Sequence, residues 1–519
     1  MGVDSAGFWR YAADHPDKTA VIDAAGAAHS YGELLSLANR MSHLLGELGV
    51  GPGSAVAFSL ANRPEAFVCV FGALQIGARC VPIGPSSRPA EAGYVLGDAD
   101  VGVFVADATA TGAGDAAARA GIDPVRCFGV GDEAPFPDLA AALAAMPEST
   151  PSHRSAGAVV CYTSGTTGKP KGVVRREFAT MEDLVADALE LAAIYGWADD
   201  GVALVQGPLY HAGPLSNALN MLHVGGRVVL MADWDPEACL AAIDRYRVTA
   251  SMMVPTMLRR LLELPAEVRA AYDVSSLRPN AIVLGGAICP PADKRAMIEW
   301  WGPVFMESYG GTEGTFARIT SQDWLEHPGS VGRAWRGVTL TALRSDGTPC
   351  DPLEVGTIYA RFSGSRPAYL NANEKTAASY RGDYFTLGDL GYLDDDGWLH
   401  IVDRRDDLII TGGVNVYPAE VEAVLQRAPG VADVAVIGVP DATWGHRVVA
   451  VVQPRDTDTP PDAEAILRFC REELAPAKCP REITFRAKLP RSSLGKLLRS
   501  EIRDELLARR SAGGTDGHR

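Results

Sequence analysis

The chain has 519 residues, of which 47% are hydrophobic and 22% charged, and its formal net charge is −16. This length exceeds what a single hydrophobic core usually supports, so we expect more than one domain. The negative charge disfavours nucleic acid and anionic membranes as partners, because both bind basic surfaces.

The cysteine and apolar patterns point to a cytoplasmic protein. Nine cysteines are scattered without a C-x-x-C pair, which predicts reduced, buried thiols rather than disulfides or a zinc site. Residues 1–6 carry no basic and apolar run, so no signal peptide is expected. No apolar stretch is long enough to cross a bilayer, so we expect no integral membrane association.

Short apolar runs alternate with helical patterns over roughly the first 400 residues. Residues 56–60 predict a strand, residues 65–76 a helix that ends at Gly77, and residues 80–83 the next strand. Further buried strands are predicted at 226–231, 281–284 and 304–307. This alternation predicts an α/β fold with largely parallel sheets, in which ligands sit at the carboxyl ends of strands.

The pattern changes near Asp403. Beyond it we predict short strands at 434–438 and 448–453, amphipathic helices and a collection of basic residues. We therefore predict a large N-terminal domain over residues 1–405, with mixed, largely parallel sheets and packed helices. A small α+β C-terminal domain is predicted over residues 406–519.

The sharpest motif is the loop at 162–172, with the sequence YTSGTTGKPKG. Its glycines let backbone N–H groups approach an anion, its hydroxyls add donors, and its lysines add positive charge. It is not a Walker A loop, because the required spacing is absent and Pro170 forbids the helix that would follow. These features predict a triphosphate cradle formed by Thr163, Ser164, Gly165, Thr166, Thr167, Gly168, Lys169 and Lys171.

This loop resembles the phosphate loop of the acyl-adenylate-forming superfamily, which includes acyl-CoA synthetases, peptide-synthetase adenylation domains and firefly-type luciferases. The likeness covers the chain from about Tyr31 to Lys496, with further motifs in the family's order. The resemblance implies ATP-dependent activation of a carboxylic acid to acyl-AMP, with release of pyrophosphate. Thioester formation with coenzyme A would follow, and Mg²⁺ would accompany the ATP.

Two segments resemble the family's nucleotide motifs. Gly285, Gly286 and Ala287 close a predicted strand and resemble the adenine-contacting turn. Residues 307–313, ESYGGTE, resemble the Y-G-x-T-E motif. A magnesium ion between phosphates keeps several waters and needs only one or two protein oxygens. The resemblance implies that Tyr309 stacks on adenine beside Ser308 and Gly310, that Thr312 contacts the α-phosphate, and that Glu313 and Thr163 hold Mg²⁺.

The motif at 386–389, Thr-Leu-Gly-Asp, resembles the family's ribose motif. The resemblance implies that Asp389 accepts hydrogen bonds from both ribose hydroxyls. Leu387 departs from the family, which usually has Thr there, so no hydrogen bond from residue 387 is expected. Arg404 resembles a second ribose or phosphate contact, and Asp406 falls at the hinge about which the C-terminal domain, a mobile lid, would rotate.

The segment at 208–213, PLYHAG, resembles the family's acyl pocket, where His211 would gate access to the carboxylate. Amino-acid-activating members usually carry an Asp nearby, and its absence disfavours an amino-acid substrate because a buried unpaired ammonium is costly. The third position of Y-G-x-T-E often holds Met but here is Gly311, which predicts a roomy, apolar pocket for a bulky hydrophobic acid. The predicted pocket residues are His211, Ala212, Gly213, Gly285, Gly311 and Gly314.

Two motifs fall in the predicted lid. Residues 410–418 resemble the loop that lines the pantetheine tunnel, with Gly412 and Gly413 flanking the thiol arm. Residues 490–496, PRSSLGK, resemble the last family motif, in which Lys496 bridges the carboxylate and the α-phosphate. The catalytic set implied by the resemblance is Lys496, Thr312, Glu313 and His211.

Several alternatives stay open at the level of sequence. The acceptor could be the pantetheine arm of a carrier protein acting in trans rather than free coenzyme A. Outside enzymes, the chain could be a non-catalytic nucleotide-binding relative, which the presence of Lys496, Glu313 and Asp389 disfavours. The sequence names neither the acid nor the oligomeric state, for which a dimer is one option.

Overall fold

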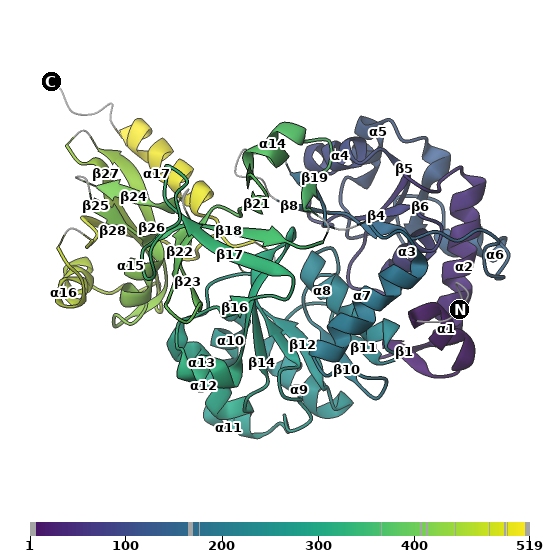
Figure 1. The fold of residues 1–519 in the computed structure, drawn as a ribbon, viewed down its shortest axis with the longest axis horizontal. Helices are drawn as coiled ribbons and strands as arrows, with labels where there is room; N and C mark the ends of the chain where they lie inside the picture. Colours follow the sequence, from purple (N-terminus) through teal and green to yellow (C-terminus); the bar gives the residue numbers. More distant parts are fainter. Residues whose placement is uncertain are drawn as a thin grey trace.

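The structure is a computed structural model of the chain. It describes residues 7–163, 170–175, 177–364, 366–404, 407–411, 414–441, 443–476, 478–492, 495 and 497–513. Within these ranges the strands form five sheets with helices packed around them, which confirms the predicted α/β class (Figure 1). None of the helices in the same ranges is both long and apolar enough to cross a membrane. All nine cysteines are free thiols, and eight of them are buried.

The largest sheet has the strand order β16-β15-β14-β13-β12-β10-β11-β1-β2. Its central strands are parallel neighbours, which is possible only because helices cross over between them. These strands are β11 (Arg227–Leu230), β10 (Val202–Val205), β12 (Ala250–Met253), β13 (Ile282–Leu284) and β14 (Phe305–Gly311). The edges are β15 (Gly314–Thr320), β16 (Arg333–Ala334), β1 (Thr19–Ile22) and β2 (Ala28–Ser30).

A second sheet is parallel throughout, in the order β6-β5-β3-β4-β7. The sequence predicted two of its strands and the following helix to within two residues, because continuous apolar runs between Gly and Pro are a local signal. The strands are β3 (Ala55–Ser59), β4 (Arg79–Pro82), β5 (Val101–Asp107), β6 (Cys127–Val130) and β7 (Ala158–Val159).

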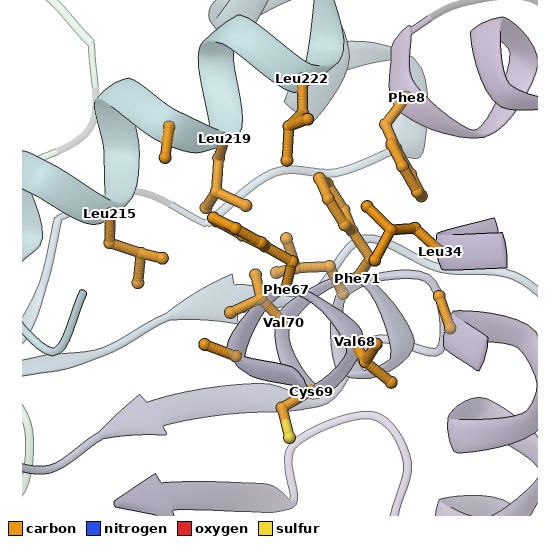
Figure 2. Packing of buried hydrophobic residues seen from close by; sticks show 14 of the residues in the cluster. Phe8, Leu34, Phe67, Val68, Cys69, Val70, Phe71, Leu215, Leu219 and Leu222 are labelled. Carbon is orange, nitrogen blue, oxygen red and sulfur yellow. The ribbon is translucent and has the colours of Figure 1, made fainter. Parts of the chain in front are cut away.

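A shared core joins these two sheets through helices, as Figure 2 shows. Helix α3 (Glu65–Leu74) is buried at every residue after its first, as expected for a helix that is apolar on all sides. Phe67 and Phe71 point from α3 toward α8 (Ala212–His223) and α1 (Gly7–Asp14). The Phe71 ring stacks on the Phe8 ring, with the two ring centroids 3.8 Å apart. Each such buried ring contributes about 1.5–3 kcal/mol. This packing fixes α8, whose first turn begins at the predicted acyl segment.

Two further sheets complete the N-terminal part. One joins β8 (Cys161–Thr163), β9 (Lys171–Val174) and β19 (Ala368–Tyr369). The other is antiparallel and contains β17 (Val338–Leu343), β18 (Gly356–Phe362), β20 (Tyr380–Arg381), β21 (Tyr384–Phe385), β22 (Asp389–Leu393) and β23 (Leu399–Arg404). The surrounding helices include α2 (Tyr31–Glu47), α4 (Pro89–Asp98), α5 (Ala113–Ala120), α7 (Met181–Ile194), α9 (Pro236–Tyr246), α10 (Pro255–Leu262) and α12 (Pro291–Trp301).

The C-terminal residues form a separate sheet, drawn in yellow-green at one end of the molecule in Figure 1. Among the described strands, none up to Arg404 shares a sheet with one from Ile409 onward. The predicted boundary at residues 405–406, and with it the hinge at Asp406, lies outside the described residues and stays a prediction. The strands are β24 (Ile409–Thr411), β25 (Val414–Val416), β26 (Val431–Asp441), β27 (Gly445–Pro454) and β28 (Glu482–Phe485), covered by α15 (Pro418–Leu425), α16 (Ala463–Glu473) and α17 (Arg499–Gly513).

The prediction that the strands of this C-terminal part are short is wrong for its central hairpin. Strands β26 and β27 have 11 and 10 residues and pair along almost their whole length. Their ends are polar and lack the apolar run on which the prediction depended. Backbone hydrogen bonds between two adjacent strands continue past the buried centre of a ladder and do not need apolar side chains.

Candidate nucleotide and acyl site

The predicted adenine turn and the Y-G-x-T-E segment lie side by side because β13 and β14 are parallel and in register, with Leu284 opposite Glu307. A Cβ on Gly285 would lie 2.9 Å from the carbonyl oxygen of Ser308, so the turn packs directly against the next strand. Gly286 has φ +86°, a conformation that favours glycine. These contacts bring Gly285, Gly286 and Ser308 together at the carboxyl edge of the sheet, where ligands of such sheets bind.

The second half of the motif is the tip of a hairpin. Gly311 pairs with Gly314 across β14 and β15, so Thr312 and Glu313 form the two-residue turn between them. A Cβ on Gly310 would lie 2.2 Å from the carbonyl oxygen of Gly314, so no side chain fits there. The tight turn therefore explains why the motif needs glycine before its Thr and Glu.

Tyr309, Asp389 and Arg404 form one group of contacts. The Tyr309 hydroxyl donates to Asp389 Oδ2 at 2.7 Å, and Arg404 Nε lies 3.3 Å from Asp389 Oδ1. Asp389 and Arg404 face each other across β22 and β23, and Asp389 is only 6% exposed. Burial and the Asp389 carboxylate raise the pKa of Tyr309 well above its usual range, so the phenol keeps its proton and donates. Three residues predicted from separate motifs thus meet at one place.

A second group gathers around Tyr369, which the sequence analysis missed. Its hydroxyl donates to Glu313 Oε1 at 2.9 Å, and Lys171 Nζ lies 4.8 Å from its ring centroid. Lys171 pairs with Thr163 across β9 and β8, so these two residues lie side by side at the two ends of the predicted phosphate loop. Tyr369 comes to them because β19 pairs with β9, and no local sequence signal reveals that pairing.

The residues of this second group fit a magnesium ion held mainly by phosphates. Glu313 is 8% exposed and, with the Thr163 hydroxyl, offers hard oxygen ligands. Across the described part of the chain, no group of three or more His, Cys, Asp or Glu side chains could hold a metal by itself. Magnesium in nucleotide sites commonly has one or two protein oxygens and takes the rest from phosphates and water, which matches this composition.

On the acyl side, His211 stands directly before α8 and its ring centroid lies 4.5 Å from that of Tyr210. Burial lowers the pKa of His211 to about 4, so the imidazole is neutral near pH 7. Ala212 and Gly213 form the first turn of α8. A Cβ on Gly213 would lie 2.4 Å from Met252 Sδ, so this thioether on β12 covers the glycine. Met252 was not predicted, and it occupies part of the space that the small residues suggested.

Side chains also fill the space next to Gly311 and Gly314. A Cβ on Gly311 would lie 2.5 Å from Glu313 Oε2 and 3.1 Å from Leu387 Cδ2. A Cβ on Gly314 would lie 3.0 Å from the Phe362 ring. The small size of these two glycines therefore does not by itself create room for an acyl group. Leu387, which departs from the family pattern, stands where a side chain at 311 would go. The assignment of both glycines to the acyl pocket stays a prediction.

We expect Gly311→Met to lower kcat/KM by ~10-fold or more for small and large acids alike, because overpacking beside Glu313 and Leu387 costs about 1–3 kcal/mol. Adding Leu387→Ala should recover part of the loss, since it removes the Cδ atoms from that space. Steady-state kinetics of the two single variants and the double variant give the coupling between them. A loss confined to large acids would instead place Gly311 on the acyl pocket wall.

Several predicted residues lie outside the described part of the chain, and their roles stay predictions. Described residues nevertheless lie on either side of them. Thr163 and Lys171 flank the phosphate loop, and Thr411 and Val414 flank Gly412 and Gly413. Gly495 and Leu497 flank Lys496. The undescribed residues are Ser164, Gly165, Thr166, Thr167, Gly168, Lys169, Asp406, Gly412, Gly413 and Lys496.

Comparison with known proteins identifies relatives over nearly the whole chain. The model of the AMP-binding enzyme family matches residues 8–370, and that of the AMP-binding enzyme C-terminal domain matches residues 420–496. A feruloyl-CoA synthase from an Amycolatopsis species is 35% identical over 505 residues, covering 96% of this chain and 98% of that protein. A 2-succinylbenzoate–CoA ligase from Geobacillus kaustophilus is 34% identical over 495 residues, covering 94% and 95%.

A solved structure agrees with these relatives. The o-succinylbenzoate CoA synthetase from Bacillus subtilis, in complex with an acyl-adenylate intermediate, superposes with a TM-score of 0.80 at 29% identity. The match covers 96% of this chain and 98% of that one. Three findings agree. Two family models match in sequence order, relatives above 30% identity match over nearly the whole chain, and two groups of contacts form around Asp389 and Glu313. The chain belongs to the AMP-binding enzyme family, and it is an AMP-forming acid–thiol ligase.

Proposed function

We propose that this enzyme uses ATP and Mg²⁺ to convert a bulky hydrophobic carboxylic acid to its acyl-adenylate, and then transfers the acyl group to coenzyme A. The observation that carries the proposal is that the Tyr309–Asp389–Arg404 group and the Glu313–Tyr369–Lys171 group are both built on the β14–β15 hairpin. A ribose needs a hydrogen-bond acceptor, which Asp389 would provide. A polyphosphate chain needs positive charge, which Lys171 and a metal at Glu313 would provide. Nine free thiols favour the cytoplasm, where such thiols stay reduced.

The first half-reaction needs positioning and charge neutralisation rather than a protein nucleophile. A carboxylate oxygen of the acid attacks the α-phosphorus of ATP, and the bond to pyrophosphate breaks. Asp389 would accept the ribose hydroxyls and hold the nucleotide in line. Thr163 and Glu313 would hold Mg²⁺, which supplies positive charge to the phosphates. Thr312 and Lys496 would donate to the α-phosphate and the carboxylate as negative charge develops there.

The second half-reaction transfers the acyl group to a thiol. The thiol of coenzyme A attacks the acyl carbon, the bond to the phosphate oxygen breaks, and AMP leaves. Neutral His211 at the start of α8 stands at the side of the proposed carboxylate path. Its lack of charge avoids an ion pair that would hold the substrate carboxylate away from the phosphorus. Gly412 and Gly413 would leave space for the pantetheine arm.

The acyl side favours an apolar acid. Met252 and the first turn of α8 offer no charge, and a small cavity of about 10 Å³, room for about one water, lies behind them. None of the described residues that line this cavity is charged; they include Trp197, Leu204, Gln206, Asn217, Ser251 and Met252. An α-amino group would find no carboxylate there. The relatives named for 2-succinylbenzoate and feruloyl groups support a bulky aromatic acid.

The test is a panel of acids incubated with ATP and Mg²⁺, with pyrophosphate and AMP measured separately. Ferulate, 2-succinylbenzoate and decanoate represent bulky acids, and acetate, propionate and phenylalanine serve as comparisons. We expect kcat/KM for the best bulky acid to exceed that for acetate by ~10²-fold or more, since each buried methylene contributes about 0.8 kcal/mol. A preference for acetate or phenylalanine would contradict the proposed substrate class.

The acceptor is tested in the same assay. Thioester should accumulate when free coenzyme A is added to the enzyme and its best acid. If thioester forms only on an added pantetheinylated carrier protein, the alternative acceptor is correct. If no acid in the panel releases pyrophosphate although ATP binds, the proposed class of acid is wrong.

A further inference from the structure

A single carboxamide joins the two parallel sheets beside the acyl segment (residues 208–213). Asn62 follows β3 of the second sheet, and its Nδ2 donates to the carbonyl of Gly207 at 3.1 Å and to that of Met231 at 3.0 Å. Its Oδ1 accepts from the Leu209 N–H at 2.8 Å. Gly207 and Met231 lie just beyond β10 and β11 of the largest sheet. Asn62 therefore connects the carboxyl ends of three parallel strands.

These three hydrogen bonds require an amide. Both Nδ2 hydrogens of Asn62 have a carbonyl acceptor and Oδ1 has an N–H donor, so the two ends of the group cannot be exchanged. A carboxylate of the same shape would set one oxygen against two carbonyl oxygens and would donate to neither. The carbonyls would also lose a partner that nothing replaces. The position therefore discriminates Asn from its closest isostere, Asp.

The hydrogen bond to Leu209 leads to His211. The His211 N–H donates to the Pro208 carbonyl at 3.1 Å, which closes a turn over residues 208–211, and Leu209 lies inside this turn. The Leu209 side chain is completely buried, and α8 begins directly after His211. Asn62 thus holds the turn whose last residue stands at the side of the proposed carboxylate path.

Tyr210, in the same turn, packs on the second sheet. A Cβ on Gly84 would lie 3.1 Å from Tyr210 Cε2 and 3.4 Å from its Cδ2 and Cζ. Gly84 lies two residues beyond β4, which pairs with β3. The Tyr210 ring centroid is 4.5 Å from that of His211. A displacement of the Tyr210 ring would therefore reach the imidazole.

We propose that Asn62 and Gly84 are positioning residues for the acyl segment, and that they determine how well the enzyme binds its acid. Asn62 acts through the backbone at Leu209, and Gly84 acts through the ring of Tyr210. Both contacts set the place of His211. The inference rests on the proposed function, because it concerns the acid that is activated in the first half-reaction.

The proposed nucleotide groups are built on other elements. The groups around Asp389 and Glu313 come from the β14–β15 hairpin, from β22 and β23, and from the pairing of β9 with β19. Neither group includes a residue of the acyl segment, Asn62 or Gly84. A disturbance confined to the acyl segment should therefore change the binding of the acid and leave the binding of ATP unchanged.

Asn62→Asp should raise KM for the best acid of the panel and lower kcat/KM by ~10-fold or more, because misplacing a substrate-positioning group by about 1 Å can cost ~10²-fold. The Kd of ATP, measured by equilibrium dialysis without acid, should stay at the wild-type value. Gly84→Ala should change KM for the acid in the same direction but only a few-fold, since the Tyr210 ring need shift only slightly to admit the methyl group.

Asn39→Asp is the matched control. Asn39, on α2, is a buried carboxamide whose Nδ2 donates to the Glu148 carbonyl at 2.9 Å and whose Oδ1 accepts from Gln75 Nε2 at 3.1 Å. The same substitution there removes hydrogen bonds of the same kind from a site without contact to the acyl segment. It should lower the thermal unfolding temperature and leave KM for the acid unchanged. Equal effects of Asn62→Asp and Asn39→Asp on this KM would overturn the proposal.

A double-mutant cycle tests the contact between Gly84 and Tyr210. Tyr210→Leu removes Cε2 and Cζ, two of the three atoms that a methyl group at residue 84 would meet. Gly84→Ala should therefore cost less in the Tyr210→Leu background than in the wild type. An equal cost in both backgrounds would show that Gly84 does not act through this ring. If Asn62→Asp does not fold, this cycle alone decides the proposal.

Failure of the inference differs from failure of the proposed function. If the wild type releases no pyrophosphate with any acid of the panel, the proposed substrate class fails, and the inference about its binding fails with it. If the wild type is active but Asn62→Asp keeps its KM for the acid, or weakens ATP binding as much as acid binding, only the inference is wrong.

Discussion

Lys496→Ala is expected to lower acid-dependent pyrophosphate release by at least ~10²-fold, while transfer from presynthesised acyl-adenylate to coenzyme A persists. The physical reason is that one preorganised positive donor aimed at developing negative charge contributes on this scale. The described neighbour Gly495 packs against Thr256 in the first turn of α10. The lysine is therefore proposed to act in the first half-reaction alone.

The measurement follows each half-reaction separately. Pyrophosphate release is measured with ATP and the best acid, and AMP release with synthetic acyl-adenylate and coenzyme A. Lys488→Ala is the matched control, because Lys488 is an exposed lysine eight positions earlier in the same segment. Its rates should equal those of the wild type. If Lys496→Ala slowed both half-reactions equally, the division of labour between lid orientations would be refuted.

Glu313→Gln is expected to lower pyrophosphate release by ~10²-fold and to raise the Mg²⁺ concentration needed for half-maximal rate. The substitution keeps the shape of the side chain but removes the negative charge that a hard cation prefers. The Glu313 carboxylate lies within the turn of the β14–β15 hairpin and already accepts one hydrogen bond from Tyr369. We expect its other oxygen to bind the metal.

Tyr369→Phe is compared with Glu313→Gln, because it leaves the Glu313 carboxylate in place and changes only its hydrogen bonding. It keeps the ring beneath Lys171 but removes the hydrogen bond that orients the carboxylate. Loss of such an orienting partner typically costs ~10–100-fold in metal affinity or activity. Initial rates across a Mg²⁺ titration distinguish the two variants from the wild type. An unchanged Mg²⁺ dependence in Glu313→Gln would show that this carboxylate is not a metal ligand.

The sequence by itself predicted those features that depend on short stretches of chain. The parallel α/β class, strands β3 and β4 and helix α3 followed from apolar runs that end at Gly or Pro. The nucleotide motifs followed from their resemblance to those of the acyl-adenylate-forming superfamily. Gly310, for example, lies where a Cβ would meet the carbonyl oxygen of Gly314 on the other side of the same hairpin. Such constraints act within a short stretch of chain, so a short stretch of sequence records them.

Contacts between distant segments were decided only by the tertiary structure. Tyr369 reaches Glu313 across 56 residues, and nothing near Tyr369 in the sequence indicates a partner. Leu387 faces Gly311, and Met252 covers Gly213, so two gaps inferred from glycines are occupied by side chains from distant segments of the chain. A glycine shows that space is needed beside the backbone, but it does not show what fills that space. Strand order and register set the neighbours, and these depend on the packing of the whole sheet.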